Sequence, residues 1–101
     1  MPGATYPLRE IRKLVAGGRF YITRSSLDGA FGLGLDDQDI VECICDHLDE
    51  AHFYKTMSAC RRPGLMQDVY RITYQGESIY LKLQIVSGSV TVISFKADES
   101  A

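Results

Sequence analysis

The 101-residue sequence lacks the features that define several large classes of protein. No apolar run approaches the roughly 18 residues of a membrane-spanning helix, and the first residues lack the apolar stretch of a signal peptide. No low-complexity tract is present. These absences favour a cytoplasmic globular protein without membrane contact, and a chain of this length is expected to form a single domain over residues 1–101.

Cysteine is scarce, and the three residues of this type do not form a disulfide framework. They are Cys43, Cys45 and Cys60, an odd number that favours reduced thiols. Cys43 and Cys45 together with His47 suggest a metal site, but on a helix only Cys43 and His47 would share a face. We therefore expect the cysteines to be small buried apolar side chains, and we expect neither a metal nor a cofactor.

A net positive charge is lacking in the chain as a whole, whose net charge is −2 and whose pI is about 5.6, but the balance of charge is positive in the second half. Residues 1–50 carry five basic and nine acidic side chains, whereas residues 51–97 carry six basic and two acidic ones. Nucleic-acid-binding proteins usually have a basic face, and a basic half of the sequence is consistent with one. Small proteins also show such asymmetry by chance.

The first half of the sequence predicts helices. Pro7 suits a first helical position, apolar residues at helical spacing follow over residues 8–15, and Gly17 and Gly18 end the segment. Residues 19–22 form a short extended piece.

Two further helices are predicted from their capping residues. Ser25 and Asp28 have the spacing of a capping box that opens a second helix, which the glycines between residues 29 and 34 close. Those glycines match no phosphate-loop fingerprint. Asp36 or Asp37 can cap a third helix. Its buried face is predicted to consist of Ile40, Val41, Ile44 and Leu48.

The second half alternates between polar and apolar residues with a period of two, which predicts strands over 69–74, 79–86 and 92–96. Gln75-Gly76 and Ser87-Gly88-Ser89 are turn signals between them, and residues 53–59 form a further strand. The fold class is therefore α+β, with N-terminal helices packed on one face of a C-terminal antiparallel β-sheet.

The turns predict the register of this sheet. Ser87-Gly88-Ser89 as a three-residue loop and Gln75-Gly76 as a two-residue turn both bring apolar residues together on one face. The predicted pairs are Leu81–Phe95, Leu83–Ile93, Tyr80–Lys96, Lys82–Ser94, Tyr70–Leu81, Ile72–Ile79 and Arg71–Tyr80. The opposite face then holds Gln67, Arg71, Tyr80, Lys82 and Lys96, while the face of Lys55 stays ambiguous. An uncovered sheet face is often merely solvated, which is the alternative.

Lysines, an arginine, a tyrosine and a glutamine on one face can bind a phosphodiester and move protons around it. Such a set points to RNA rather than to a small apolar ligand. Metal-independent cleavage of RNA uses the 2′-hydroxyl of the substrate as the nucleophile, and DNA lacks that group. The protein must then accept a proton, stabilise a phosphorane-like dianion and protonate the departing 5′-oxygen. An RNA-binding protein without chemistry is a second possibility.

Several motifs in the second half resemble those of one known family. They are residues 53–57 (FYKTM), 67–71 (QDVYR), 80–82 (YLK) and 94–96 (SFK), with looser similarity at Val15, 23–25 and 33–36. With these residues the chain resembles the MqsR family of toxins, the ribonuclease half of type II toxin–antitoxin pairs. The resemblance implies a RelE-like α+β fold.

The resemblance also implies an activity and a partner. The activity is that of a sequence-specific mRNA interferase that needs no ribosome, with Lys55, Gln67, Tyr80 and Lys96 as catalytic residues. The partner is an antitoxin with a zinc-binding part and a helix-turn-helix DNA-binding part, so that operator DNA is reached only through the antitoxin. The alternative is a weakly active or inactive relative that acts as an antitoxin-binding transcriptional co-regulator.

Roles can be assigned to these side chains from their chemistry. Lys55 and Lys96 stabilise charge, and either can act as acid or base, whereas Tyr80 donates or shuttles a proton. Gln67 orients the phosphate or contacts a base edge. Further RNA contacts are expected from Arg71, Lys82, Arg61 and Arg62. Alternatively, Arg71 has a structural role instead of binding the RNA phosphate.

Two features bear on how the site works. His47 is expected to be structural, and His52 can reach the site from just before the sheet. The acidic pI differs from the basic character expected of the family. RNA binding is therefore expected to be weaker or more salt-sensitive, unless the acidic residues lie on the helical side away from the RNA.

Overall fold

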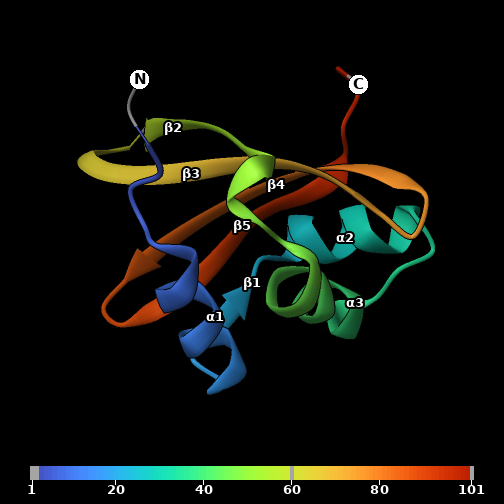
Figure 1. Ribbon diagram of the computed structural model, residues 1–101, viewed down its shortest axis with the longest axis horizontal. Coiled ribbons are helices and arrows are strands. Elements are labelled where there is room, and N and C mark those ends of the chain that lie inside the picture. Colours follow the sequence, from blue (N-terminus) through green and yellow to red (C-terminus); the bar gives the residue numbers. More distant parts are fainter. Residues whose placement is uncertain (1–2, 60, 101) are drawn as a thin grey trace.

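The computed structural model describes residues 3–59 and 61–100, and within these residues five strands form one sheet that helices cover on one face (Figure 1). The elements are α1 (Leu8–Ala16), β1 (Phe20–Ile22), α2 (Arg24–Gly32), α3 (Asp37–Glu42), a π turn η1 (Cys43–His47), a 3₁₀ turn η2 (Glu50–His52), β2 (Phe53–Ala59), β3 (Arg62–Tyr74), β4 (Glu77–Val86) and β5 (Ser89–Ala97). This confirms the predicted α+β class.

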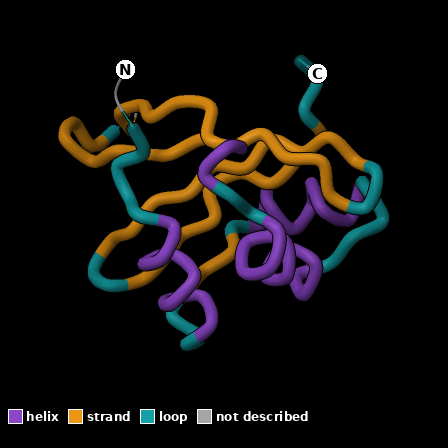
Figure 2. Tube along the Cα trace, in the orientation of Figure 1, coloured by secondary structure: helices purple, strands orange, loops and turns teal. Residues whose placement is uncertain are grey.

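The core lies between the helices and one face of the sheet (Figure 2). Each buried side chain of Leu or Ile size stabilises the fold by roughly 1.5–3 kcal/mol relative to an exposed one. The helical side contributes Leu8, Ile11, Val15, Ile40, Cys43, Ile44 and Leu48, and the sheet contributes Tyr70, Ile72, Ile79, Leu81, Leu83, Val92 and Phe95. In the described residues no helix is long and apolar enough to cross a membrane.

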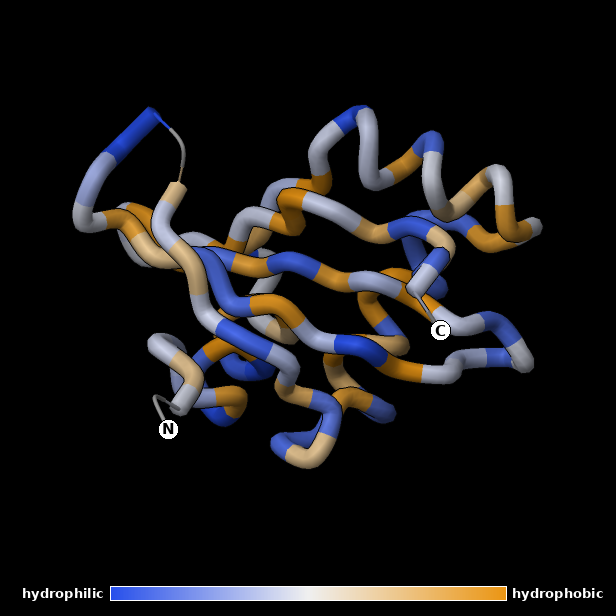
Figure 3. Tube along the Cα trace, turned by 90° about the horizontal axis from the view of Figure 1, so that it is seen from above, coloured by the Kyte–Doolittle hydropathy of each residue, from blue (hydrophilic) through white to orange (hydrophobic). Residues whose placement is uncertain are grey.

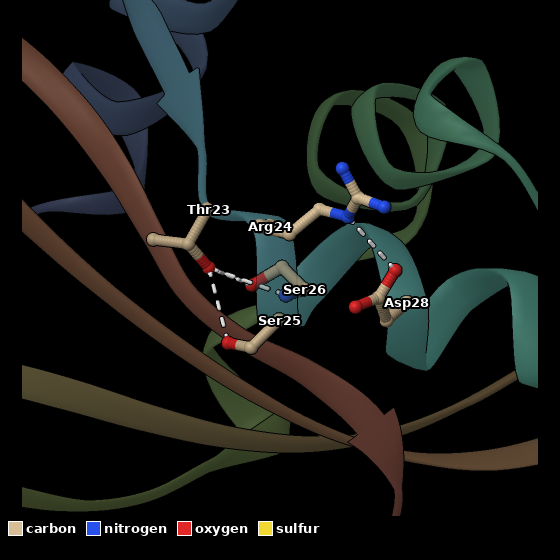
Figure 4. Close-up of polar contacts among 5 residues, drawn as sticks. All are labelled: Thr23, Arg24, Ser25, Ser26 and Asp28. Carbon is tan, nitrogen blue, oxygen red and sulfur yellow. Dashed lines mark hydrogen bonds and ion pairs between the residues drawn. The ribbon is translucent and has the colours of Figure 1, made fainter.

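The start of α2 differs from the prediction. Thr23, rather than Ser25, is the N-cap, because its Oγ1 accepts the backbone N–H of Ser26 at 3.2 Å (Figure 4). Asp28 is not part of a capping box and instead forms an ion pair with Arg24 four residues earlier. Ser26 is buried, and its hydroxyl donates to the carbonyl of Val92 in β5 at 2.9 Å. The hydrogen bond from Ser26 to β5 therefore favours a helix that begins after Thr23.

The other helix boundaries are mostly as predicted. Pro7 lies one position earlier than expected, as the N-cap of α1, because its ψ of 135° is extended. Asp36 caps α3 in a reciprocal arrangement with Asp39. The third helix is shorter than its predicted apolar face, since α3 gives way to η1 at Cys43.

The sheet order is β1-β5-β4-β3-β2, and β1 pairs in parallel with the first half of β5. Beyond β1, helix α2 covers the edge of β5 that β1 leaves unpaired. Gly29 makes this possible, because a Cβ at this position would lie 2.0 Å from the carbonyl oxygen of Phe95. The sequence predicted an extended piece at 19–22 but not its place at the edge of the sheet.

The register between β3 and β4 is the predicted one, and Gln75-Gly76 is a two-residue turn. The β4–β5 turn was predicted wrongly. Ser87 and Gly88 alone form it, with φ angles of 53° and 72°, as a tight hairpin turn requires. Leu83 therefore pairs with Val92 rather than with Ile93.

A β-bulge at Ile93 then restores the predicted register. The pairing shifts by one residue between Lys82 and Leu83, so that Tyr80 lies opposite Lys96 and Lys82 opposite Ser94, as predicted. Val92, which the two-residue turn places opposite Leu83, is buried, whereas Ile93 at the bulge is half-buried.

Residues 61–64, which lie between the predicted strands 53–59 and 69–74, are largely strand. β3 begins at Arg62, and a register shift after Ser58 brings Ala59 opposite Arg62. Gly64, with a φ of 91°, accommodates the irregular backbone of this hairpin end.

Replacement of Gly29 by alanine is predicted to push α2 away from β5. The added Cβ would meet backbone atoms that cannot rotate aside, so we expect the free energy of unfolding to fall by about 1–3 kcal/mol. Thermal and urea unfolding measure this loss, at roughly 4–8 °C in Tm per kcal/mol.

Gly32→Ala in the same helix is the matched control, since a Cβ there has no heavy atom within 4 Å. Its stability should equal or slightly exceed that of the wild type. Equal stability of the two alanine variants would contradict the close packing of α2 on β5.

Candidate functional site

The candidate site occupies the sheet face that the helices leave uncovered. Hydrophilic and hydrophobic residues alternate along the strands when the sheet is seen from above (Figure 3). The register confirms that Tyr80 lies between Arg71 on β3 and Lys96 on β5, and that Lys82 lies opposite Ser94. We call this surface the outer face.

Tyr80 and Lys96 form the centre of the outer face. The Nζ atom of Lys96 lies 5.3 Å from the centroid of the Tyr80 ring, within cation–π distance. Lys96 is exposed and Tyr80 is half-buried. Both line an open hollow of about 350 Å³ that also includes Asp98. The phenol group and the ammonium group can therefore act on one bound phosphate.

A second hollow, of about 380 Å³, gathers four other residues that were predicted to bind RNA or act on it: Gln67, Lys82, Arg61 and Arg62. The amide of Gln67 is held in place, because its Nε2 donates to Oε1 of Gln84 at 3.2 Å. Ile93, at the bulge of β5, contributes an apolar wall.

The ambiguity about Lys55 is resolved by a register shift in β2. The shift lies between Phe53 and Lys55, so that Lys55 pairs with Val69, whose other neighbour is Lys82. Lys55 is exposed on the outer face, and its Nζ atom lies 5.5 Å from the Tyr54 ring centroid. Lys55 and Lys82 are two strands apart, about 10 Å between Cα atoms.

The four residues predicted to be catalytic share the outer face but do not form one contact cluster. Gln67 is level with Gln84, four residues along β4 from Tyr80, which corresponds to about 13 Å. The arrangement suits an extended polymer that crosses several strands better than it suits a small molecule.

Arg71 has a partner that the sequence did not indicate. Its Nε donates to Oδ2 of Asp98 at 2.7 Å, and its guanidinium carbon lies 5.0 Å from the Tyr54 ring centroid. The Asp98 side chain is only 5% exposed and also accepts bonds from Ser100. The bond from Arg71, followed by those from Ser100, lowers the pKa of Asp98, and the same pair raises the pKa of Arg71.

Asp68 belongs to the 67–71 motif but points to the other side of the sheet. It is fully buried and accepts the backbone N–H groups of Thr5 at 3.0 Å and Tyr6 at 2.8 Å. Tyr6 in turn donates its hydroxyl to the carbonyl of Met66 at 2.7 Å. Asp68 therefore anchors the N-terminal segment beneath β3.

The acidic residues are concentrated on the helical side. This segregation leaves the outer face basic in a chain of net charge −2. The acidic side chains of the segment from α2 to η2 are Asp28, Asp36, Asp37, Asp39, Glu42, Asp46, Asp49 and Glu50.

Cys43, Cys45 and His47 have structural surroundings. Burial raises the pKa of the Cys43 thiol to about 12, and burial also raises that of Cys45, which is half-buried. Cys60 lies outside the described residues. His47 packs edge-to-face against Tyr74, with ring centroids 5.1 Å apart.

Within residues 3–59 and 61–100, no three His, Cys, Asp or Glu side chains are grouped so that they could hold a metal ion. His52 accepts the Asp49 backbone N–H through Nδ1 at 3.0 Å. It also lines a hollow beside Arg71 on the outer face.

An α+β fold with one uncovered, basic and aromatic sheet face is typical of nucleic-acid-binding proteins. Comparison with known proteins specifies the family. The model of the family described as "Motility quorum-sensing regulator, toxin of MqsA" matches residues 3–97, and the chain belongs to this family. It is 37% identical over 89 residues to the mRNA interferase toxin MqsR of Escherichia coli (strain K12), which covers 88% of this chain and 89% of that protein.

The Arg71–Asp98 pair predicts a pH-dependent difference in stability. The pKa of Asp98 is lower in the folded protein than its ordinary value of 3.8, so its charged form stabilises the fold above about pH 4 and this contribution is lost as the pH falls further. Asp98→Asn should therefore lower Tm at neutral pH, by an amount that shrinks below about pH 4. Thermal unfolding across this pH range measures the difference.

Glu99→Gln is the control, because Glu99 is an exposed neighbour of Asp98. Its Tm should follow that of the wild type at every pH. A gap between Asp98→Asn and wild type that stays constant into acid would show that the ion pair is not its source.

Proposed function

We propose that this protein is the toxin of a type II toxin–antitoxin pair and that it is an endoribonuclease that cleaves mRNA without the ribosome. Membership of a family described as toxins of MqsA, with a relative named as an mRNA interferase, carries this proposal. The basic outer face with Tyr80 and Lys96 at its centre supports it.

The proposed reaction is an attack of the 2′-oxygen on the adjacent phosphorus. A base on the protein accepts the 2′-hydroxyl proton, the bond from O2′ to phosphorus forms, and the bond from phosphorus to O5′ breaks. The departing 5′-oxygen takes up a proton. The products are a 2′,3′-cyclic phosphate and a 5′-hydroxyl, and no metal takes part in these steps.

Tyr80 and Lys96 suit the scissile phosphate because they are adjacent. The Tyr80 hydroxyl donates or shuttles a proton, and the Lys96 ammonium stabilises the negative charge that develops on the phosphate oxygens. Lys55 supplies a second positive charge from β2, two strands away from the strand that carries Tyr80. Gln67, whose amide is fixed by Gln84, orients the neighbouring nucleotide.

The remaining cations contact the RNA backbone. Lys82 lies two residues along β4 from Tyr80 and shares a hollow with Arg61 and Arg62. Phosphate contacts of this kind supply most of the sequence-independent affinity for nucleic acid. Most acidic residues lie on the helices and the loops between them, away from this path, although Asp98 and Glu99 line the hollow of Tyr80 and Lys96.

The partner that we propose is an antitoxin of the MqsA type. We further propose that it contains a zinc-binding part and a helix-turn-helix part, and that the complex acts on operator DNA through the latter. Zinc then belongs to the antitoxin rather than to this chain.

A ribosome-free assay tests the proposed activity. Purified protein and a long synthetic mRNA, with EDTA present, should give discrete cuts that end in cyclic phosphates. Tyr80→Phe with Lys96→Ala removes the proton donor and the charge, and each such loss is expected to slow cleavage by about 10²–10⁴-fold.

The matched control is Tyr21→Phe with Lys13→Ala, which removes the same groups from β1 and α1. This variant should cut at the wild-type sites and rate. Both double variants should stay folded, because all four positions are exposed or half-buried. Intact RNA after incubation with folded wild-type protein would refute ribosome-independent cleavage.

Lys82→Ala should weaken RNA binding mainly at low salt. Loss of one phosphate contact flattens the slope of log affinity against log salt by about 0.7 for single strands. Fluorescence anisotropy measures this on an RNA with 2′-deoxyribose at the mapped cut, which cannot react. Lys13→Ala on α1 should leave the slope unchanged, and an equal change in both variants would contradict the assigned RNA path.

A further inference from the structure

A third hollow on the outer face, larger than the two described for Tyr80 and Gln67, lies beside Arg71. It measures about 480 Å³, within the range of roughly 300–1,000 Å³ common for ligand sites. His52, Tyr54, Arg71, Thr73, Ser78 and Asp98 are among the residues that line it. Asp98 also lines the hollow of Tyr80 and Lys96, so the two spaces adjoin.

Tyr54 provides an aromatic surface at this hollow. The register shift between Phe53 and Lys55 sets it apart from the regular pairing of β2, and it is 52% exposed. The Arg71 guanidinium, 5.0 Å from the ring centroid, helps to hold the ring in place. An exposed aromatic ring held in this way is a surface on which a base of single-stranded RNA can stack.

The charge of this hollow differs from that of the rest of the outer face. Asp98 neutralises Arg71 through the 2.7 Å bond to Nε, whereas Lys55, Lys82 and Lys96 form no ion pair within the described residues. Among the described residues Arg71 is the one Lys or Arg side chain that lines this hollow, and it is already paired, whereas Lys96 in the adjoining hollow is not. This difference favours an uncharged base here and the phosphate beside Lys96.

The hollow also offers groups that can bind the edge of a base. Asp98 uses Nε of Arg71, which leaves the two terminal nitrogens for a ligand as far as the described residues show. The hydroxyls of Thr73 and Ser78, which face each other across β3 and β4, add both donors and acceptors.

We propose that this hollow binds one nucleobase of the RNA, next to the phosphate held at Tyr80 and Lys96, with the base packed against Tyr54 and Arg71. This inference rests on the proposed function and adds a subsite to it. Because Arg71 and Tyr80 are cross-strand neighbours, the base belongs to a nucleotide that flanks the cut.

A cycle of protein and RNA changes tests the subsite. A short RNA with one mapped cut is made with an abasic ribose at each position in turn, and kcat/KM is measured for wild type and Tyr54→Ala. At one flanking position the abasic RNA should be cleaved by wild type about 5- to 150-fold less efficiently, the factor that one stacked base contributes. Tyr54→Ala should lose a similar factor on the intact RNA and little more on that abasic RNA.

Two variants serve as controls. Tyr54→Phe keeps the ring and should retain the response of the wild type. Tyr21→Ala removes another exposed tyrosine, 62% exposed on β1 at the opposite edge of the sheet, and should not alter the response at that nucleotide. Independent losses from Tyr54→Ala and from the abasic ribose at every position would overturn the proposal.

The same cycle, measured as binding to RNA with 2′-deoxyribose at each position, separates this inference from the proposed activity. Cleavage by wild type without coupling to Tyr54 leaves the endoribonuclease in place and removes the subsite. Binding with coupling but without cleavage supports the subsite and removes the activity. A folded wild-type protein that neither binds nor cleaves RNA overturns both.

Discussion

The bulge at Ile93 is the constraint on which the geometry of the outer face depends. The two-residue turn alone would place Tyr80 opposite Phe95 and turn Lys96 toward the core. The extra residue reverses the facing of β5 beyond the bulge, so that Phe95 is buried and Lys96 lies beside Tyr80. Thr23 donates its hydroxyl to the Ile93 carbonyl at 3.2 Å, and Ser26 donates to Val92. The start of α2 thus stabilises the bulge.

Much of the sheet could be predicted because alternation and a glycine turn limit the register. Gln75-Gly76 gave the β3–β4 pairing correctly. Ser87-Gly88-Ser89 permits either two or three loop residues, and the longer reading reached the right Tyr80–Lys96 pair only because the bulge supplies the residue that the turn does not. A bulge stabilised by Thr23, 70 positions earlier in the chain, leaves no local signal.

Other contacts escaped prediction for the same reason. The pairing of Arg71 with Asp98 joins residues 27 positions apart, and the place of β1 depends on β5. The cap of α2 was misassigned because Ser25 and Thr23 are both suitable capping residues, with Ser the more favoured type, and contacts with β5 decide between them. The assignment of Lys55, Gln67, Tyr80 and Lys96 to catalysis rests on family resemblance, whereas register accounts for the shared face of the last three.

The motif over residues 67–71 has a consequence for genetic screens. Gln67 and Arg71 face the hollows of the outer face, while Asp68 and Tyr70 are buried on the side that holds the N-terminal segment and the core. Neighbouring residues of this short motif are therefore under different selective pressures, some for activity and others for stability. A selection for survivors of toxin expression would recover substitutions across the whole stretch, and only the amount of intact protein in each survivor would separate a lost reaction from a lost structure.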